Sequence, residues 1–140
     1  MKLSTKSKKS PLRGVIAGAL LGLATLGFLA PAHAAGEEVV MYKDPNCGCC
    51  GKWAEHMREH GFKVKEVATT QMDVVKREAR VPQALGSCHT AKVGGYVVEG
   101  HVPAADVRRM LGEKPAISGI SAPGMPMGSP GMEGPYPADR

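Results

Sequence analysis

Three of the four cysteines in the 140-residue chain fall within the stretch PNCGCCGKW, residues 45–53. Cys47 and Cys50 have C-x-x-C spacing, Cys49 lies between them, and Cys88 follows much later in GSCHT. The thiolate form of cysteine attacks disulfides and binds soft metal ions. The set is therefore suited either to thiol–disulfide exchange or to metal binding.

Cys49 is the residue that separates these two chemistries. A dithiol oxidoreductase needs one attacking and one resolving thiol, and a third thiol beside them invites scrambled disulfides. In a metal site an extra sulfur is an additional ligand, and thiolates select Cu(I), with Zn(II) as the commoner alternative. We therefore predict a metal site made of Cys47, Cys49, Cys50 and Cys88.

The histidines are weaker ligand candidates than the cysteines. His89 adds an imidazole next to Cys88, but alternation along a strand predicts that it points to the opposite face. His56 and His60, at i, i+4 spacing among charged residues, are interpreted as part of a solvated helix face. His101, in EGHVP, is interpreted as a turn residue.

Other arrangements of the cysteines must also be weighed. Two structural disulfides are common in a small exported domain, but adjacent Cys49 and Cys50 cannot both easily reach well-formed partners within one turn. A closed structural zinc site usually has two C-x-x-C pairs, and Cys88 supplies half of the second. An iron–sulfur cluster fits an exported chain less well.

The N-terminal region has the three-part pattern of a secretory signal. Residues 2–13 carry five positive charges and no acid, residues 14–30 are uncharged and rich in Ala, Leu and Gly, and APAHA follows. This pattern predicts a Sec signal peptide over residues 1–34 with cleavage after Ala34. A retained membrane anchor is the alternative, since the apolar run is close to the lower limit for a membrane span.

Cleavage changes the charge of the chain. The full sequence has 18 Lys and Arg against 13 Asp and Glu, but five of the basic residues lie before residue 35. The mature chain then has equal numbers of basic and acidic residues. No basic stripe is left to neutralise phosphates, so we predict no nucleic-acid partner.

The mature chain has the pattern of an α/β domain over residues 35–114. Apolar spacing and turn residues predict strand, helix, strand, helix, hairpin and helix. These elements are expected at residues 39–41, from 49 or 50 to 60, at 62–68, at 71–81, on both sides of Gly94 and Gly95, and at 103–112. Trp53 and Met57 are assigned to the core face of the first helix.

Two strands joined through a helix should be parallel, and the hairpin should add antiparallel strands beside them. The fold class predicted is thus α/β and thioredoxin-like, with a mixed sheet of about four strands and three helices. Residues 115–140 are rich in Pro, Gly and Met and predict a flexible tail. Met125, Met127 and Met132 offer thioethers for loose Cu(I) binding, although linker composition explains them nearly as well.

Three stretches together resemble the CopG-type copper-resistance proteins, a bacterial periplasmic family with a domain of unknown function. They are YKDPNCGCCGKWAEHMREHGF, VPQALGSCHTAKVGGYVVEGHVPAADVRRML and GMPMGSPGME. The resemblance implies a thioredoxin-like fold, a periplasmic location and binding of one or more Cu(I) ions by the matching cysteines. Copper ions and other periplasmic copper-handling proteins would be its partners, with no membrane anchor after signal cleavage.

Two rival functions stay open at this point. One is a periplasmic thiol–disulfide oxidoreductase that uses Cys47 and Cys50, and the other is a disulfide-stapled interaction module without metal. A redox activity of the copper protein itself, with Cys47 and Cys50 as the redox couple, is a separate hypothesis.

Overall fold

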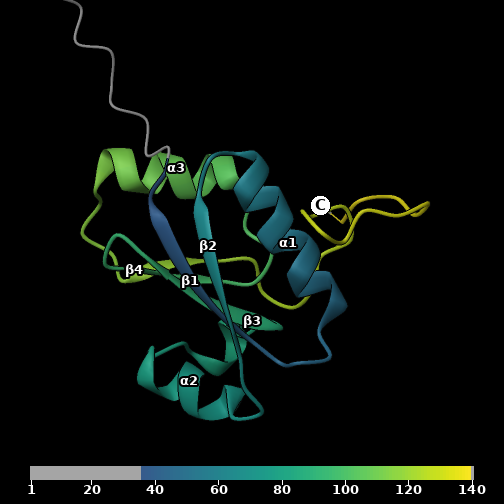
Figure 1. The fold of residues 1–140 in the computed structure, drawn as a ribbon, viewed down its shortest axis with the longest axis horizontal. Helices are drawn as coiled ribbons and strands as arrows, with labels where there is room; N and C mark the ends of the chain where they lie inside the picture. Colours follow the sequence, from purple (N-terminus) through teal and green to yellow (C-terminus); the bar gives the residue numbers. More distant parts are fainter. Residues whose placement is uncertain (1–35, 140) are drawn as a thin grey trace, which may run out of the picture. The chain divides into compact units, whose positions relative to one another are not determined.

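The computed structural model describes residues 36–139, which form an α/β unit with a five-stranded mixed sheet and three α-helices (Figure 1). The predicted signal peptide, residues 1–34, lies outside the described residues. The strands are β1 (Glu38–Lys43), β2 (Lys63–Ala68), β3 (His89–Val93), β4 (Tyr96–Glu99) and β5 (Gly119–Ser121). The helices are α1 (Gly48–Glu59), α2 (Met72–Glu78) and α3 (Ala104–Glu113), with a short 3-10 turn at Gln83–Leu85.

The sheet has the strand order β2-β1-β3-β4-β5. β1 and β2 are parallel and joined through α1, while β3 is antiparallel to both β1 and β4. Gly94 and Gly95 form the two-residue turn between β3 and β4, and both have positive φ, as a tight hairpin of this length requires. This topology places the N-terminus of α1 and the start of β3 at the same edge of the sheet.

α1 forms because its apolar residues recur on one face, and it ends where the chain reverses. Its buried residues are Cys50, Trp53, Ala54 and Met57. Gly61 follows the C-cap with φ of 87°, and the amide of Phe62 bonds back to the carbonyl of Met57 at 3.1 Å. A glycine in the left-handed region after the last turn is the usual way to end a helix.

The hydrophobic core lies between the sheet and the pair α1 and α3. Fully buried side chains of β1 and β3, such as Val39, Met41 and Ala91, meet Trp53 from α1 and Val107 from α3. The opposite face of the sheet contacts α2, whose Lys76 reaches Thr90 of β3. α2 has no buried residue, so it adds little to the core.

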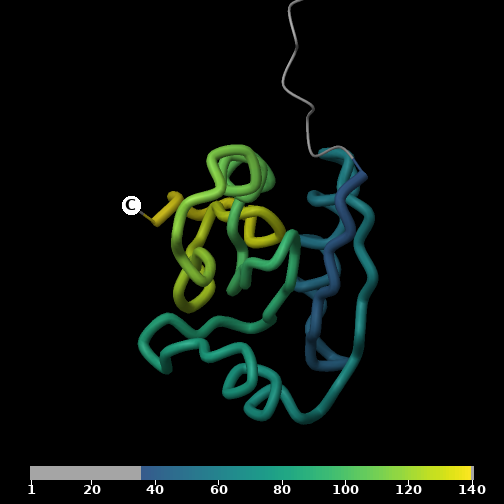
Figure 2. Tube along the Cα trace, turned by 90° about the vertical axis from the view of Figure 1, so that its left-hand side faces the viewer, coloured from purple at the N-terminus to yellow at the C-terminus, as the bar shows by residue number. Residues whose placement is uncertain are grey.

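The C-terminal segment differs from the expected flexible tail in part of its length. Residues 119–121 form β5, which pairs in parallel with β4, and residues 129–132 fold back on α1. This segment runs from yellow-green to yellow in Figures 1 and 2, and in Figure 1 its yellow part lies next to α1. The strand was missed because three residues that include Gly119 are too short to show an alternating apolar pattern.

The structure confirms the α/β class, the mixed sheet and the three helices, with one more strand than predicted. α3 continues past Gly112 and ends at Glu113, because Lys114 adopts the left-handed conformation that glycine was expected to supply. The thioredoxin-like assignment stays a prediction.

Candidate metal centre

The four cysteine sulfurs come together at the start of α1. The Sγ atoms of Cys47, Cys49, Cys50 and Cys88 all lie within 4.8 Å of one another. Cys50 is fully buried and the other three are half-buried against the core. The expected return of Cys88 to the CGCC turn is therefore confirmed.

Three of the four cysteines lie at the N-terminal end of α1. Cys47 is the N-cap residue, and Cys49 and Cys50 belong to the first turn. The amide groups of a first helical turn have no partners within the helix, and the helix dipole is positive there. A metal ion is bound by thiolate, so thiols at this turn must release their protons when a metal binds.

Cys47 and Cys50 are joined by a disulfide in this structure, whereas Cys49 and Cys88 are free. The sulfurs of Cys47 and Cys49 are 3.6 Å apart. Two of the four predicted ligands are thus oxidised, and they can bind a metal only after reduction. The two free thiols also argue against a module stapled by two disulfides.

Cys88 is a partly buried thiol with a raised pKa. Burial, together with the nearby charge of Cys49, raises the pKa of the Cys88 thiol to about 11, although the Ser87 hydroxyl acts in the opposite direction. The thiol is therefore protonated at neutral pH. Binding of a metal ion by Cys88 must release that proton.

His101 contacts Cys88 and was missed as a site residue. Its Nε2 lies 2.9 Å from the Cys88 sulfur, and the residue is fully buried. The β3–β4 register pairs Thr90 with Glu99, and Gly100 donates a backbone hydrogen bond to the carbonyl of His89. Extending this register by two positions beyond Thr90–Glu99 places Cys88 opposite His101, so the Gly-Gly turn was the signal that could have predicted the contact.

His89 also lies next to Cys88, which corrects the expected opposite orientation. Its Nδ1 is 3.4 Å from the Cys88 sulfur, and its ring packs against Trp53 with centroids 4.5 Å apart. Alternation failed as a guide because β3 begins at His89, so Cys88 lies outside the strand. Burial, with smaller effects of His101 and Lys76, lowers the pKa of His89 to about 3, and its imidazole is neutral.

A buried carboxylate holds the loop before β3 from the other face of the sheet. Glu99 is 2% exposed and pairs with Lys76. It accepts hydrogen bonds from the Thr90 hydroxyl and from the backbone amide of Ser87, both at 2.7 Å. Because Ser87 precedes Cys88 directly, this network fixes the position of the fourth sulfur.

Residues 129–132, which we call the C-terminal strap, contact both His101 and the start of α1. The carbonyl of Pro130 lies 2.7 Å from Nδ1 of His101, and both Pro130 and Gly131 are buried. Gly131 has φ of 85°, and a Cβ added to it would lie 2.8 Å from the carbonyl oxygen of Cys49. The strap therefore packs backbone to backbone on the first turn of α1.

The other predicted features lie apart from the cysteines. Nε2 of His56 accepts a hydrogen bond from the amide of Ala104 at 3.2 Å, and His60 is exposed. Neither histidine belongs to a cluster of potential metal ligands among the described residues. Met125, the first thioether of the C-terminal segment, is 53% exposed.

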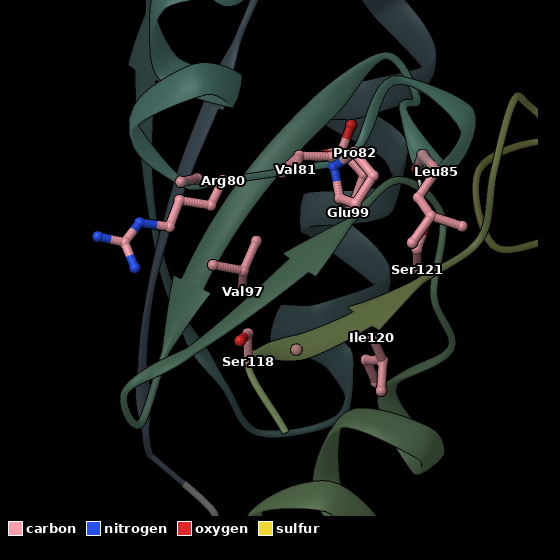
Figure 3. Close-up of a pocket in the computed structure, with 11 residues that line it drawn as sticks. Arg80, Val81, Pro82, Leu85, Val97, Glu99, Ser118, Ile120 and Ser121 are labelled. Carbon is pink, nitrogen blue, oxygen red and sulfur yellow. Dashed lines mark hydrogen bonds between the residues drawn. The ribbon is translucent and has the colours of Figure 1, made fainter. Parts of the chain in front are cut away.

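The structure also contains a pocket of about 240 Å³ between the loop after α2 and the strands β4 and β5 (Figure 3). It is lined by side chains such as Arg80, Leu85 and Ile120, and none of its lining residues is a cysteine or a histidine. The pocket is therefore not part of the metal centre.

Comparison with known proteins identifies relatives of the chain. A family model described as "Protein of unknown function, DUF411" matches residues 85–132. A solved structure titled "Copper resistance protein copG- Form 2" is 43% identical, with a TM-score of 0.70, over 74% of this chain and 83% of the other. Its counterpart titled "Form 1" is 44% identical, with a TM-score of 0.68, over 73% and 81%. No curated protein matches the chain.

Fold and site together define an α/β protein with a thiol-rich centre that is suited to binding a soft metal ion. The chain belongs to the CopG family of copper resistance proteins, and it carries the DUF411 domain of unknown function. Within residues 36–139 there is no helix of the length and apolar character needed to cross a membrane.

Proposed function

We propose that the protein is a periplasmic Cu(I)-binding protein that contributes to copper tolerance, with Cys47, Cys49, Cys50 and Cys88 as the ligands. The observation that carries this proposal is the gathering of four sulfurs within 4.8 Å of one another. His89, the weaker ligand candidate, lies beside Cys88 at 3.4 Å. The copper resistance proteins among its relatives support copper as the metal.

The ligand set favours Cu(I) over harder ions. Thiolates are soft ligands, and imidazole also suits copper. Four thiolates within one small volume repel one another, and cations placed between them offset this repulsion. Thiolate sulfur can bridge two ions, so the site can hold more than one Cu(I).

Reduction of the Cys47–Cys50 disulfide must come before copper binding by these two residues. The reduction takes two electrons and two protons and yields two thiols, which lose their protons when they bind copper. The oxidised protein retains two free sulfurs, those of Cys49 and Cys88. It should therefore bind fewer copper ions, and bind them more weakly, than the reduced protein.

The competing function is thiol–disulfide exchange. The observation in its favour is the disulfide between Cys47 and Cys50, which have C-x-x-C spacing at the start of α1. Such an enzyme should reduce a model disulfide, tolerate Cys49→Ser and lose activity with Cys47→Ser. A copper-binding protein should lose affinity for copper with either substitution.

Titration of the anaerobically reduced mature chain with Cu(I), against a chromogenic chelator, tests the proposal. Wild type should retain copper stoichiometrically, and Cys88→Ser should bind fewer ions or bind them at least tenfold more weakly. Met125→Leu, which changes an exposed thioether of the C-terminal segment, is the matched control and should behave as wild type. Full copper affinity in Cys88→Ser and Cys49→Ser would show that the ligand assignment is wrong.

Location can be tested independently of copper. Fractionation of cells that express the full chain should recover it in the periplasm, and its mass should correspond to cleavage after Ala34. A product that keeps residues 1–34 in the membrane fraction would contradict the proposed export.

A further inference from the structure

We propose that the free edge of β5 is a dimer interface, at which β5 pairs in antiparallel fashion with β5 of a second copy of the chain. β5 is the last strand of the described sheet, and β4 is its one neighbour there. An edge strand presents a row of backbone N–H and C=O groups that can pair with another chain. The inference involves neither the cysteines nor copper, so it stands apart from the proposed function.

Gly119 and Ser121 carry the backbone groups that face the free edge of β5. The carbonyl of Ser118 and the amide of Ala122 bond to β4, at 2.9 and 3.0 Å. Residues of a parallel strand bond alternately to one neighbour, so Ile120 also bonds to β4, while Gly119 and Ser121 face away from it. Within residues 36–139, the backbone N–H and C=O groups of these two residues make no hydrogen bond. They are therefore open to a further strand.

The opposite edge of the sheet, β2, is protected against such pairing. The carbonyl of Val64 accepts a hydrogen bond from Arg58 at 3.0 Å, and the same guanidinium pairs with Glu66 at 2.9 Å. Lys63 and Lys65 add two more charges to this strand. Charged side chains along an edge oppose pairing with a second strand. β5, with the sequence GIS, has no such charge. The sheet thus has one blocked edge and one open edge.

Exposed aliphatic side chains border the open edge on both faces of the sheet. Leu85 is 42% exposed and Ile117 is 48% exposed, and they are two of the four exposed large hydrophobic side chains in the described part of the chain. Leu85 lines the pocket of about 240 Å³, and Ile117 lines a second pocket of about 330 Å³ beside α3. Figure 3 shows Leu85 and Ile120 on opposite sides of β5. Exposed apolar side chains that gather at one place mark an interaction surface.

The distribution of charge favours a second copy of the chain as the partner. The mature chain has equal numbers of basic and acidic residues, so two copies do not repel each other through net charge. Residues 115–132 contain no charged side chain, so pairing at β5 brings no like charges together. Pairing of β2 with its own copy would instead place its lysines close to one another, which is destabilising.

A two-fold axis at Ile120 gives the register that uses both outward-facing residues. Gly119 of one copy then lies opposite Ser121 of the other, and each such pair exchanges two N–H···O hydrogen bonds. Ile120 lies opposite its own copy in a pair without hydrogen bonds, where side chains approach most closely. A Cβ at Gly119 would clash with the backbone of Val97, so this position of the edge carries no side chain. The register joins the two sheets into one.

Sedimentation of the copper-free mature chain, in its disulfide form, tests the inference. Non-reducing electrophoresis of the same samples detects copies that are joined by an intermolecular disulfide. Because β5 has three residues, the pairing should be weak, and the weight-average mass should rise from one to two chain masses between about 10 and 500 µM. Nuclear magnetic resonance over this range should show shifts of the Gly119 and Ser121 amide signals. The amide signal of Val64, on the blocked edge, should stay unchanged.

Ile120→Lys tests the position of the two-fold axis. It places two like charges opposite each other, so the dissociation constant of the dimer should rise at least about tenfold. Val64→Lys, at a partly buried position of the blocked edge, is the matched control and should dimerise as wild type. Circular dichroism shows whether each variant folds. If Ile120→Lys does not fold, the wild-type amide signals decide.

Three results would overturn the inference. The first is a wild type that stays monomeric at the highest concentration, with unchanged signals of Gly119 and Ser121. The second is a mass that keeps rising beyond two chains, because pairing about a two-fold axis closes after two copies. The third is a monomer whose Gly119 and Ser121 signals shift only when a synthetic peptide of alternating valine and threonine is added. That result would assign the edge to an extended peptide instead of a second copy.

Discussion

Cys88 is a weak acid and His89 beside it is a weak base, and both are uncharged in the folded protein at neutral pH. The thiol is held protonated by burial, and His89 is held neutral by burial. The centre without metal therefore contains little charge away from the α1 turn. A cation that enters it replaces a proton on sulfur, so copper loading should release protons to solvent.

The raised pKa of Cys88 predicts its reactivity. Alkylation requires the thiolate, so the rate at Cys88 should keep rising tenfold per pH unit to beyond pH 10. An ordinary cysteine, with a pKa of about 8.5, levels off above about pH 9.5. Mass spectrometry of iodoacetamide-treated protein in its Cys47–Cys50 disulfide form measures this rate. A plateau of the Cys88 rate near pH 9 would contradict the assignment of a buried, protonated thiol.

The lowered pKa of His89 predicts acid sensitivity. Above pH 6.5 the imidazole is neutral in both the folded and the unfolded chain, so its contribution to stability is complete there. Between pH 6.5 and about 3 only the unfolded chain takes up the proton, so stability falls as the pH falls. Between pH 7 and pH 4 the loss should be about 3 kcal/mol. Urea unfolding of His89→Gln should show a flatter pH dependence than unfolding of wild type or His60→Gln. Equal slopes would contradict this explanation.

At the scale of elements, the site depends on segments from both faces of the sheet. The Glu99 network holds the loop before β3 from the α2 side, whereas the C-terminal strap contacts α1. These segments fix the distance between Cys88 and the α1 turn. Changes in either segment should therefore affect the site without removing a ligand.

Glu99→Gln tests the first of these supports. It leaves Lys76 without its carboxylate partner and weakens the hydrogen bond from the amide of Ser87. Removal of one partner of a buried ion pair costs about 3 to 5 kcal/mol of unfolding free energy. Because Lys76 is only partly buried, we expect a loss at the lower end, about 3 kcal/mol. Chemical denaturation measures the loss, and Glu113→Gln, at an exposed position without a salt bridge among the described residues, should change stability little. Equal effects of the two substitutions would argue against a role of Glu99 in the loop.

Gly131→Ala tests the strap against a control with the same backbone conformation. Gly124 has φ of 70° and open space around its Cα, whereas a Cβ at Gly131 would meet the backbone of α1. Both substitutions carry the cost of a left-handed alanine, about 1 to 2 kcal/mol. Gly131→Ala should lose at least about 1 kcal/mol more, because the clash is with backbone atoms. Matching losses in urea unfolding would mean that the strap is not tightly packed.

The elements could be predicted from the sequence where a long apolar period or a turn residue marked them. α1, β1 and the Gly94–Gly95 hairpin are of this kind, and so is the return of Cys88 to the α1 turn. β5 could not be predicted, because it depends on pairing with β4 rather than on its own pattern. The contact of Pro130 with His101 joins residues far apart in the chain, and no local pattern encodes it.

At the scale of the whole molecule, the oxidation state of the cysteines determines how much copper the chain can hold. The Cys47–Cys50 disulfide removes two of four sulfur ligands and leaves Cys49 and Cys88 with the two buried histidines. Oxidised and reduced protein should therefore differ in copper capacity. In the periplasm, the location proposed above, disulfides form readily, so both forms of the chain would occur there.

Native mass spectrometry of the mature chain, loaded with Cu(I) in its disulfide form and after anaerobic reduction, tests the central claim most directly. The account predicts that the reduced chain carries more copper ions than the oxidised chain, and that Cys88→Ser lowers the number in the reduced chain. Equal copper content in all three samples, or none in the reduced wild type, would contradict a copper site built from these four cysteines.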